Sequence, residues 1–304
     1  MLRSLNVTSI VFAAVLLMLL SSLPAQSAEK GHYVPGVEGI KAATLPPPGV
    51  YFRSYNVFYS ASTLNDGKGN EAPVNFDVSV YAMANRLIWM TDKKFLGATF
   101  GMDFIVPLVR TDIKIGAAGI DDSKFALGDI YFEPLLLAWH GPKYDAGFGV
   151  SFYAPTGQYD KLEPASAGMD FWTTMLTFGA TGYFDQQKLW SISALGRYEF
   201  NSEKSETKIK PGQDFLIEWG LARNVNKVWD LGVSGYCLWQ TTDDSGTGAT
   251  YDTGVHDRVY SIGPEVSAFI MPAMAFLSVR VLREFSSQDR SEGWTTAVTF
   301  TKIF

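Results

Sequence analysis

Charged side chains recur at alternate positions within apolar segments, and these residues are the ones best placed for binding chemistry. In "GDIYFEP", Asp129, Tyr131 and Glu133 share one face of an extended segment, because successive side chains of a strand point to opposite sides. An enclosed charge is tolerated only when it is hydrated or paired. The sequence therefore predicts an inward-facing set that consists of Asp77, Asp103, Asp129, Tyr131, Glu133, Tyr153, Arg197, Asp214, Glu218, Asp230, Tyr236, Glu265 and Arg280.

Two interpretations of this set stay open on the sequence alone. The carboxylates and the two arginines, Arg197 and Arg280, can form a network of ion pairs that closes a narrow interior. The same residues can instead line a hydrated passage, in which the tyrosines supply surface that is both apolar and hydrogen-bonding. The first interpretation predicts a structural scaffold and the second predicts a pore.

Catalytic chemistry has weak support in this sequence. His256 lies next to Asp257, as in a hydrolase dyad, but adjacent residues of a strand point to opposite faces and do not share a site readily. No serine has a recognisable nucleophile context, and the acidic pair Asp243 and Asp244 is typical of a solvated loop. We expect no catalytic residue, no cofactor and no metal site. The net charge of -6 provides no basic stripe for nucleic acid.

The first 28 residues have the pattern of a secretory signal sequence. Arg3 precedes an apolar run from Ile10 to Leu20, and "AQSA" supplies small residues for cleavage after Ser27 or Ala28. The alternative, an uncleaved membrane anchor, needs a longer apolar run of about 20 residues. We expect an exported protein. A single cysteine, Cys237, excludes an internal disulfide as the source of its stability.

The elements that carry these residues have the two-residue period of β-strands. In "FLIEWGL", Phe215, Ile217 and Trp219 alternate with Leu216 and Glu218, so one face is apolar and the other is polar. Short and long connections alternate along the chain. The short ones are expected at Thr91–Lys94, Gly141–Lys143, Asp185–Lys188, Asn224–Lys227 and Met271–Ala273, and the long ones at Thr63–Pro73, Thr111–Lys124, Pro155–Gly168, Asn201–Lys210, Thr241–His256 and Ser286–Glu292.

This organisation predicts an all-β fold, a single closed antiparallel up-and-down transmembrane β-barrel of about twelve strands. Tight periplasmic turns and long external loops are typical of outer-membrane barrels, whereas a soluble sandwich has shorter strands and Greek-key connections. In "GWTTAVTFTKIF", the final Phe304 is expected at the periplasmic interface, on a strand that closes the barrel against the first one. It resembles the C-terminal signature that bacterial barrel-assembly machinery recognises.

Several segments together resemble the phenol meta-pathway degradation family of bacterial outer-membrane proteins. They are "GHYVPGVEGIKAATLPPPGVYFRSYNVFYSAS", "ALGDIYFEPLLLAWHGPKYDAGFGVSFYAPTGQYD", "YCLWQTTDDSG", "RVYSIGPEVS" and "REFSSQDRSEGWTTAVTF". The segment "GMDFWTTM" departs from the usual motif, which contains Asn and Tyr. The resemblance implies uptake of hydrophobic small molecules and brings no catalytic residues.

The expected organisation is a cleaved signal over residues 1–28, a pre-barrel segment over 29–49 and an outer-membrane barrel over 50–304. The pre-barrel segment is interpreted either as a periplasmic tail or as a plug in the periplasmic mouth. The expected partners are outer-membrane lipid, the barrel-assembly machinery and small aromatic molecules, with no nucleic acid. The expected function is non-catalytic passage of aromatic compounds such as phenols. The alternatives are a closed structural or partner-binding barrel and, third, an outer-membrane hydrolase.

Overall fold

The alternating segments of the sequence form long antiparallel strands in the computed structural model, which describes residues 30–304. The predicted signal sequence lies outside the described residues. The strands are β1 (Gly49–Leu64), β2 (Phe76–Phe95), β3 (Ala98–Ile115), β4 (Ile120–Leu127), β5 (Ile130–His140), β6 (Tyr144–Ala154), β7 (Thr173–Tyr183), β8 (Trp190–Asn201), β9 (Asp214–Val225), β10 (Trp229–Gln240), β11 (Arg258–Ile270), β12 (Ala275–Gln288) and β13 (Ser291–Ile303). Two single-turn 3-10 helices, η1 (Gly116–Ala118) and η2 (Met271–Ala273), lie in connections. From residue 30 to the C-terminus, none of the helices has the length and apolar character needed to cross a membrane.

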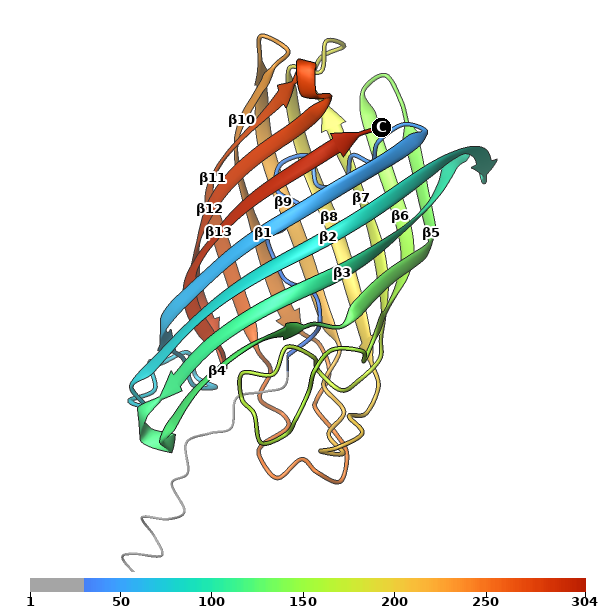
Figure 1. Cartoon of the computed structure of the whole chain (residues 1–304). Helices are drawn as coiled ribbons and strands as arrows, with labels where there is room; N and C mark the ends of the chain where they lie inside the picture. Colours follow the sequence, from blue (N-terminus) through green and yellow to red (C-terminus); the bar gives the residue numbers. More distant parts are fainter. Residues whose placement is uncertain (1–29) are drawn as a thin grey trace, which may run out of the picture.

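The strands close into a ring, as predicted (Figure 1). Each strand pairs with the next one along the chain, except that β3 pairs with β5 past β4. The ring is closed by β1 and β13, which pair along nearly the whole length of β1, from Tyr51 opposite Ile303 to Leu64 opposite Ser291. The ring contains twelve strands because β4 pairs only with the far half of β3, outside the ring. A closed ring leaves no unpaired sheet edge, which is the requirement for a sheet in lipid.

The two faces of the wall have opposite polarity. On β13, Trp294 and Phe300 are exposed on the outside, whereas Thr295 and Thr299 point inward and are buried. The same division holds on the other strands of the ring, where large apolar side chains cover the outside and charged or hydroxyl side chains fill the inside. A water-soluble protein has its apolar side chains inside and its polar side chains outside. The barrel has the opposite arrangement, so its outer surface is suited to lipid.

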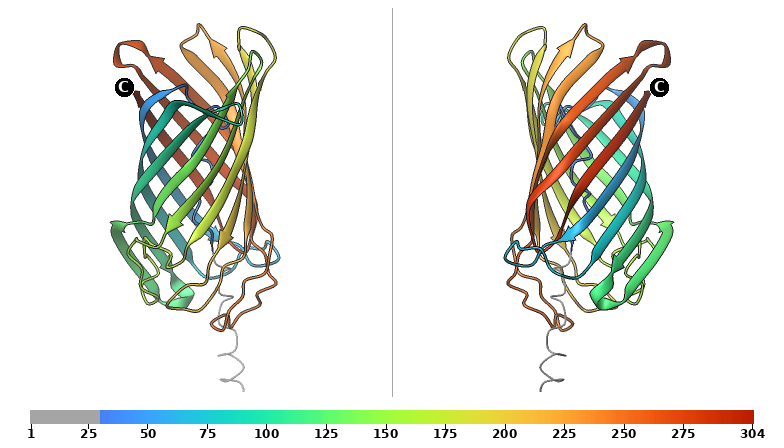
Figure 2. Two further views of the ribbon diagram at one scale, coloured as in Figure 1. Left: turned by 90° about the vertical axis from the view of Figure 1, so that its right-hand side faces the viewer. Right: turned by 90° about the vertical axis from the view of Figure 1, so that its left-hand side faces the viewer.

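The two ends of the barrel differ in their connections (Figure 2). We name them the short-turn end and the long-loop end. The turn between β2 and β3 is Leu96–Gly97, with φ values of 50° and 78°, so the predicted turn at Thr91–Lys94 is wrong by a few residues. The predicted long connection Ser286–Glu292 is also wrong, since only residues 289 and 290 separate β12 from β13. Strands that continue beyond the membrane become polar on both faces, and such sequences resemble loops.

The C-terminus lies at the short-turn end, where the backbone N–H of Phe304 donates to the carbonyl oxygen of Val50 at 3.1 Å. If the assembly machinery recognises the exposed ring of Phe304, as the sequence predicts, Phe304→Ala should reduce the yield of folded barrel. The measurement is the fraction of membrane-inserted protein that keeps its compact migration in unheated detergent gels. Phe276→Ala, which removes another exposed aromatic of the same end, is the control. Equal losses in the two variants would contradict a specific role of Phe304.

Candidate functional site

The lumen is occupied by residues 30–48, here called the N-terminal segment. At the long-loop end, the ring of His32 bonds Asp129 at 2.9 Å and Thr173 at 2.7 Å. Near the short-turn end, the hydroxyl of Thr44 donates to that of Thr181 at 3.0 Å. The segment therefore runs along the whole interior (Figures 1 and 2), farther than a plug confined to the short-turn mouth.

Two glycines let the segment turn close to the wall. Gly36 and Gly39 have φ values of +84° and +70°, a left-handed conformation that other residues rarely adopt. A β-carbon on Gly39 would lie 2.2 Å from the carboxylate of Glu265, so no side chain fits there. After the turns, the connection to β1 contains Pro46, Pro47 and Pro48, which favour a stiff extended chain. Since proline has no backbone N–H, these residues leave no donor that requires an acceptor.

Inward-facing carboxylates hold the backbone of the segment. Glu218 accepts hydrogen bonds from the N–H groups of Gly36 at 3.1 Å and Glu38 at 2.9 Å. Glu265 accepts from the N–H of Ile40 at 2.8 Å. Because the segment has no sheet partner for these donors, the wall carboxylates satisfy groups that would otherwise be buried without a hydrogen bond.

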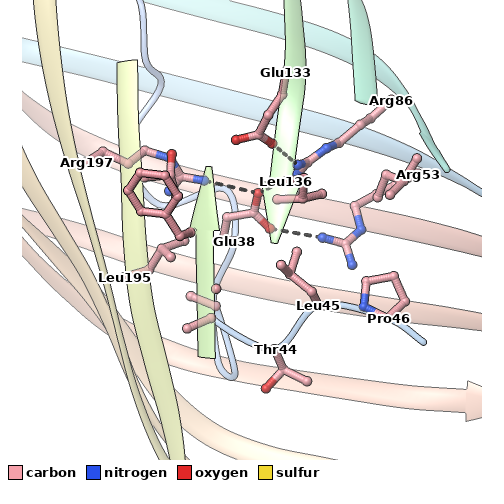
Figure 3. A pocket seen from close by; sticks show the side chains of 16 residues that line it. Glu38, Thr44, Leu45, Pro46, Arg53, Arg86, Glu133, Leu136, Leu195 and Arg197 are labelled. Atoms are coloured by element: carbon pink, nitrogen blue, oxygen red, sulfur yellow. Dashed lines mark hydrogen bonds and ion pairs between the residues drawn. The ribbon is translucent and has the colours of Figure 1, made fainter. Parts of the chain in front are cut away.

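The carboxylate of Glu38 lies at the centre of an arginine cluster (Figure 3). It is 2.9 Å from Arg53, 3.0 Å from Arg86 and 3.4 Å from Arg197. Arg53 and Arg86 lie directly opposite each other on β1 and β2, where two like charges repel unless an anion lies between them. The N-terminal segment supplies that anion, so its middle part is fixed electrostatically.

His32 anchors the segment at the long-loop end through both ring nitrogens. Burial lowers the pKa of His32 below its ordinary value of 6.5. The ring stacks on Tyr153 at 4.8 Å and packs edge-on against Phe171 at 4.4 Å between ring centroids. Asp129 also accepts hydrogen bonds from backbone N–H groups of the loop between β6 and β7. The segment and that external loop are thereby joined through one carboxylate.

Most residues of the predicted inward set meet the N-terminal segment or one another. Those that touch the segment are Asp129, Tyr153, Arg197, Glu218, Asp230, Tyr236, Glu265 and Arg280. Asp103 and Glu133 pair with Arg86, Tyr131 packs on Tyr153, and Asp214 lies beside Gly31.

Asp77 is the exception to the predicted set. It is exposed, while its neighbours Phe76 and Val78 on β2 line the interior. The expectation that Asp77 faces inward is therefore wrong. This part of β2 lies near the long-loop end, where the outer face of the strand meets water instead of lipid. A polar side chain there can point outward, so polarity no longer shows which face of the strand lines the lumen.

Sequence reasoning missed Glu38, Arg53 and Arg86, the residues of the central cluster. A signal for Arg53 was present, because it shares a strand face with Tyr51 and Tyr55, both of which are buried inside. No local signal identified Glu38, because its segment has no regular period and one of its partners, Arg197, is 159 residues away in the chain. The suspected His256 and Asp257 pair is separated, since His256 bonds Asp243 and Asp257 bonds Arg290.

Two cavities lie along the same side of the N-terminal segment. The long-loop cavity has a volume of about 420 Å³, and its apolar wall comes mainly from β1, β2 and β3. The short-turn cavity has a volume of about 500 Å³ and is lined by the segment and by β1, β11, β12 and β13. Among residues 30–304, no group of three or more His, Cys, Asp or Glu side chains is arranged to hold a metal ion.

A contact of packed side chains, here called the neck, separates the cavities. Along β1, Arg53 lines the short-turn cavity, Val57 lines the long-loop cavity, and the buried Tyr55 lies between them. On β13, the fully buried Ala297 has the same intermediate position. Val37 of the segment packs against the cluster that Tyr55 and Ala297 form with Val57. The neck therefore consists of Val37, Tyr55 and Ala297.

The sequence of residues 61–300 matches the family described as "Putative MetA-pathway of phenol degradation". The chain belongs to this family. A search of curated protein sequences found no match. The fold is similar to the COG4313 outer membrane channel from Pseudomonas putida F1, with a TM-score of 0.76 and 14% identity over 90% of this chain and 100% of that one.

Two other barrels are more distant from this member of the phenol-degradation family. The translocator domain of autotransporter NalP from Neisseria meningitidis has a TM-score of 0.48 and 11% identity, with 98% of each chain covered. A Pseudomonas aeruginosa FadL homologue has a TM-score of 0.41 and 11% identity, covering 83% of this chain and 88% of that one.

This phenol-degradation family protein is located in the bacterial outer membrane. The closed ring, the apolar outer face and the fold of an outer-membrane channel agree on that location. Lipid contacts the outer face, where exposed Trp89, Trp190 and Trp229 lie near the short-turn end. In the usual orientation of such barrels the short-turn end faces the periplasm and the long-loop end faces the exterior.

Proposed function

We propose that this protein passes small molecules with apolar or aromatic bodies across the outer membrane, without catalysis. The observation that carries the proposal is the pair of cavities that lie end to end beside the N-terminal segment, with only the neck between them. Along β1, β12 and β13, the residues that line one cavity are followed by those that line the other. The neck residues Tyr55 and Ala297 lie between the two sets on β1 and β13. The family description, which refers to phenol degradation, supports aromatic compounds as the transported class.

The route has three parts with different chemistry. Apolar side chains such as Val78 and Ile113 receive the body of the molecule at the external side. The neck is closed by side-chain packing, so a shift of Val37 is needed for passage. The short-turn cavity then offers hydroxyl groups, including Ser267 and Thr301, and balanced charges toward the periplasm.

Entry of solutes into liposomes tests the proposal. Vesicles that contain the protein should swell faster than empty vesicles in phenol-like solutes and only slowly in sugars. If no solute enters faster than it does in protein-free vesicles, passage is disproved. The closed structural barrel, the second candidate, predicts that result, and it is favoured by the dense contacts between the segment and the wall.

Ala297→Trp should reduce the flux of phenol-like solutes to near the protein-free rate, because the added ring fills the neck. Thr296→Trp is the matched control, since the next residue on β13 belongs to the opposite, lipid-facing side. Both proteins should show the same compact migration in unheated gels. Equal flux through the two variants would show that molecules take a path other than the neck.

A further inference from the structure

The long-loop cavity combines an apolar wall with one polar corner. The apolar wall includes Val57, Val78, Val80, Ile113 and Leu238. A pocket of several hundred cubic ångströms that is mostly apolar, with a few polar groups in fixed places, is the usual form of a small-molecule site. The volume of about 420 Å³ is sufficient for one aromatic ring with a short side chain.

The polar corner contains a buried acceptor that the protein leaves open. Asp257 is 4% exposed, and its Oδ2 accepts a hydrogen bond from Arg290 at 2.8 Å. Within residues 30–304, its Oδ1 and the Nε of Arg290 have no hydrogen-bond partner. A buried polar atom without a partner costs free energy, so an occupant that bonds Asp257 would be stabilised.

Glu284, a second carboxylate at this corner, differs from Asp257. Glu284 accepts from the hydroxyl groups of Tyr236 at 2.6 Å and Tyr59 at 2.8 Å, and from the N–H of Gly293 at 2.7 Å. Its hydrogen-bonding capacity is used by the protein itself. Of these two carboxylates, Asp257 is therefore the one with an acceptor atom left for an occupant. The sign of the surrounding charge selects which occupant is favoured.

The charge at the corner is predominantly acidic. The cavity is lined by four carboxyl side chains, Glu199, Asp214, Asp257 and Glu284, and by two basic ones, Lys30 and Arg290. A carboxylate ligand would add a further negative charge to this group, whereas an ammonium group would offset it and donate to Asp257. A neutral hydroxyl can donate to Asp257 but adds no charge attraction.

We propose that the long-loop cavity is a binding site for small amphipathic molecules that have an apolar or aromatic body and an ammonium head, with hydroxyl heads bound less tightly and carboxylate heads disfavoured. This inference rests on the proposed function, because the occupant is a molecule on its way to the neck. The apolar body lies against the β1–β3 wall, and the head donates to Oδ1 of Asp257.

Three probes with the same body test the inference: 2-phenylethylamine, 2-phenylethanol and phenylacetate. Binding is measured by calorimetry on the purified mature protein in detergent at pH 7. The affinity should fall in that order, with the amine at least about ten-fold tighter than the carboxylate, as expected for a charge-assisted hydrogen bond. Phenylacetate binding as tightly as the amine would overturn the proposal.

Asp257→Asn should weaken binding of the amine by about ten-fold and that of the alcohol much less. Asp243→Asn is the control, because Asp243 bonds His256 in the external loop and does not line the cavity. Val78→Trp, which fills the cavity without changing a charge, should abolish binding of all three probes. Unchanged amine binding in Asp257→Asn or in Val78→Trp, with compact gel migration retained, would place the ligand elsewhere.

Liposome flux of the same probes separates this inference from the proposed function. Amine binding without any flux would disprove passage and leave the binding site in place. Equal flux of all three probes, together with equal binding, would disprove the head-group preference and leave passage intact.

Discussion

Removal of residues 30–45 from the mature chain should raise the single-channel conductance several-fold in planar bilayers. The segment runs through the whole lumen, and the side chains it touches point into the space that would become water-filled. A ring of twelve strands is intermediate between small barrels filled by side chains and open porins, so the segment decides whether a wide path exists.

The wall should tolerate this deletion because its inward carboxylates become hydrated rather than unpaired in a dry interior. A matched control is the deletion of residues 246–254 from the external loop between β10 and β11, which shortens the chain and leaves the lumen filled. If the lumen-deletion variant folds, as judged by gel migration, and conducts like the full chain, the segment does not restrict the path.

Replacement of Glu38 by Gln should shift the channel toward anions and weaken the fold. Three arginines, Arg53, Arg86 and Arg197, converge on this carboxylate within 3.4 Å. Without the negative charge of Glu38, the three guanidinium groups next to the neck lose one of the carboxylates that offset them. The path then becomes more positive and favours anions. Removing one partner of a buried ion pair costs about 3 kcal/mol or more, and this loss should appear in the free energy of unfolding.

The reversal potential across a salt gradient measures the charge selectivity, and urea unfolding in detergent measures the stability. Glu163→Gln is the control, because Glu163 of the external loop after β6 forms a partly exposed pair with Lys124 of β4, outside the ring. Exposed pairs of this kind contribute about 0–1 kcal/mol, so little change is expected. If Glu38→Gln has the selectivity and stability of the full chain, the arginine cluster does not depend on Glu38.

The ring of strands was predictable because alternation is a local property. Segments such as β9 and β13 show it clearly, since lipid and lumen impose opposite polarity on neighbouring positions. β4 was not predicted: residues 120–127 continue a hairpin with β3 beyond the membrane, where both faces meet water and alternation loses its meaning. The errors at Asp77 and at the β12–β13 turn have the same cause.

Only the part of the site that the barrel wall contributes was predictable from the sequence. The inward carboxylates could be found because each belongs to a strand with a regular period. Their partners could not be found, because the segment of residues 30–48 has no period, and the contact between Glu38 and Arg197 joins residues 159 positions apart. Alternation along a strand tells which way Glu218 points, but it carries no information on what Glu218 binds.

The three prolines that join the N-terminal segment to β1 affect how well a free peptide could compete with this segment for the lumen. A ligand tethered by a short, stiff linker meets its receptor at an effective concentration in the millimolar range or above. Release and rebinding of residues 30–45 are therefore independent of dilution. A free peptide of the same sequence would have to be added at comparable concentration before it displaced the tethered copy.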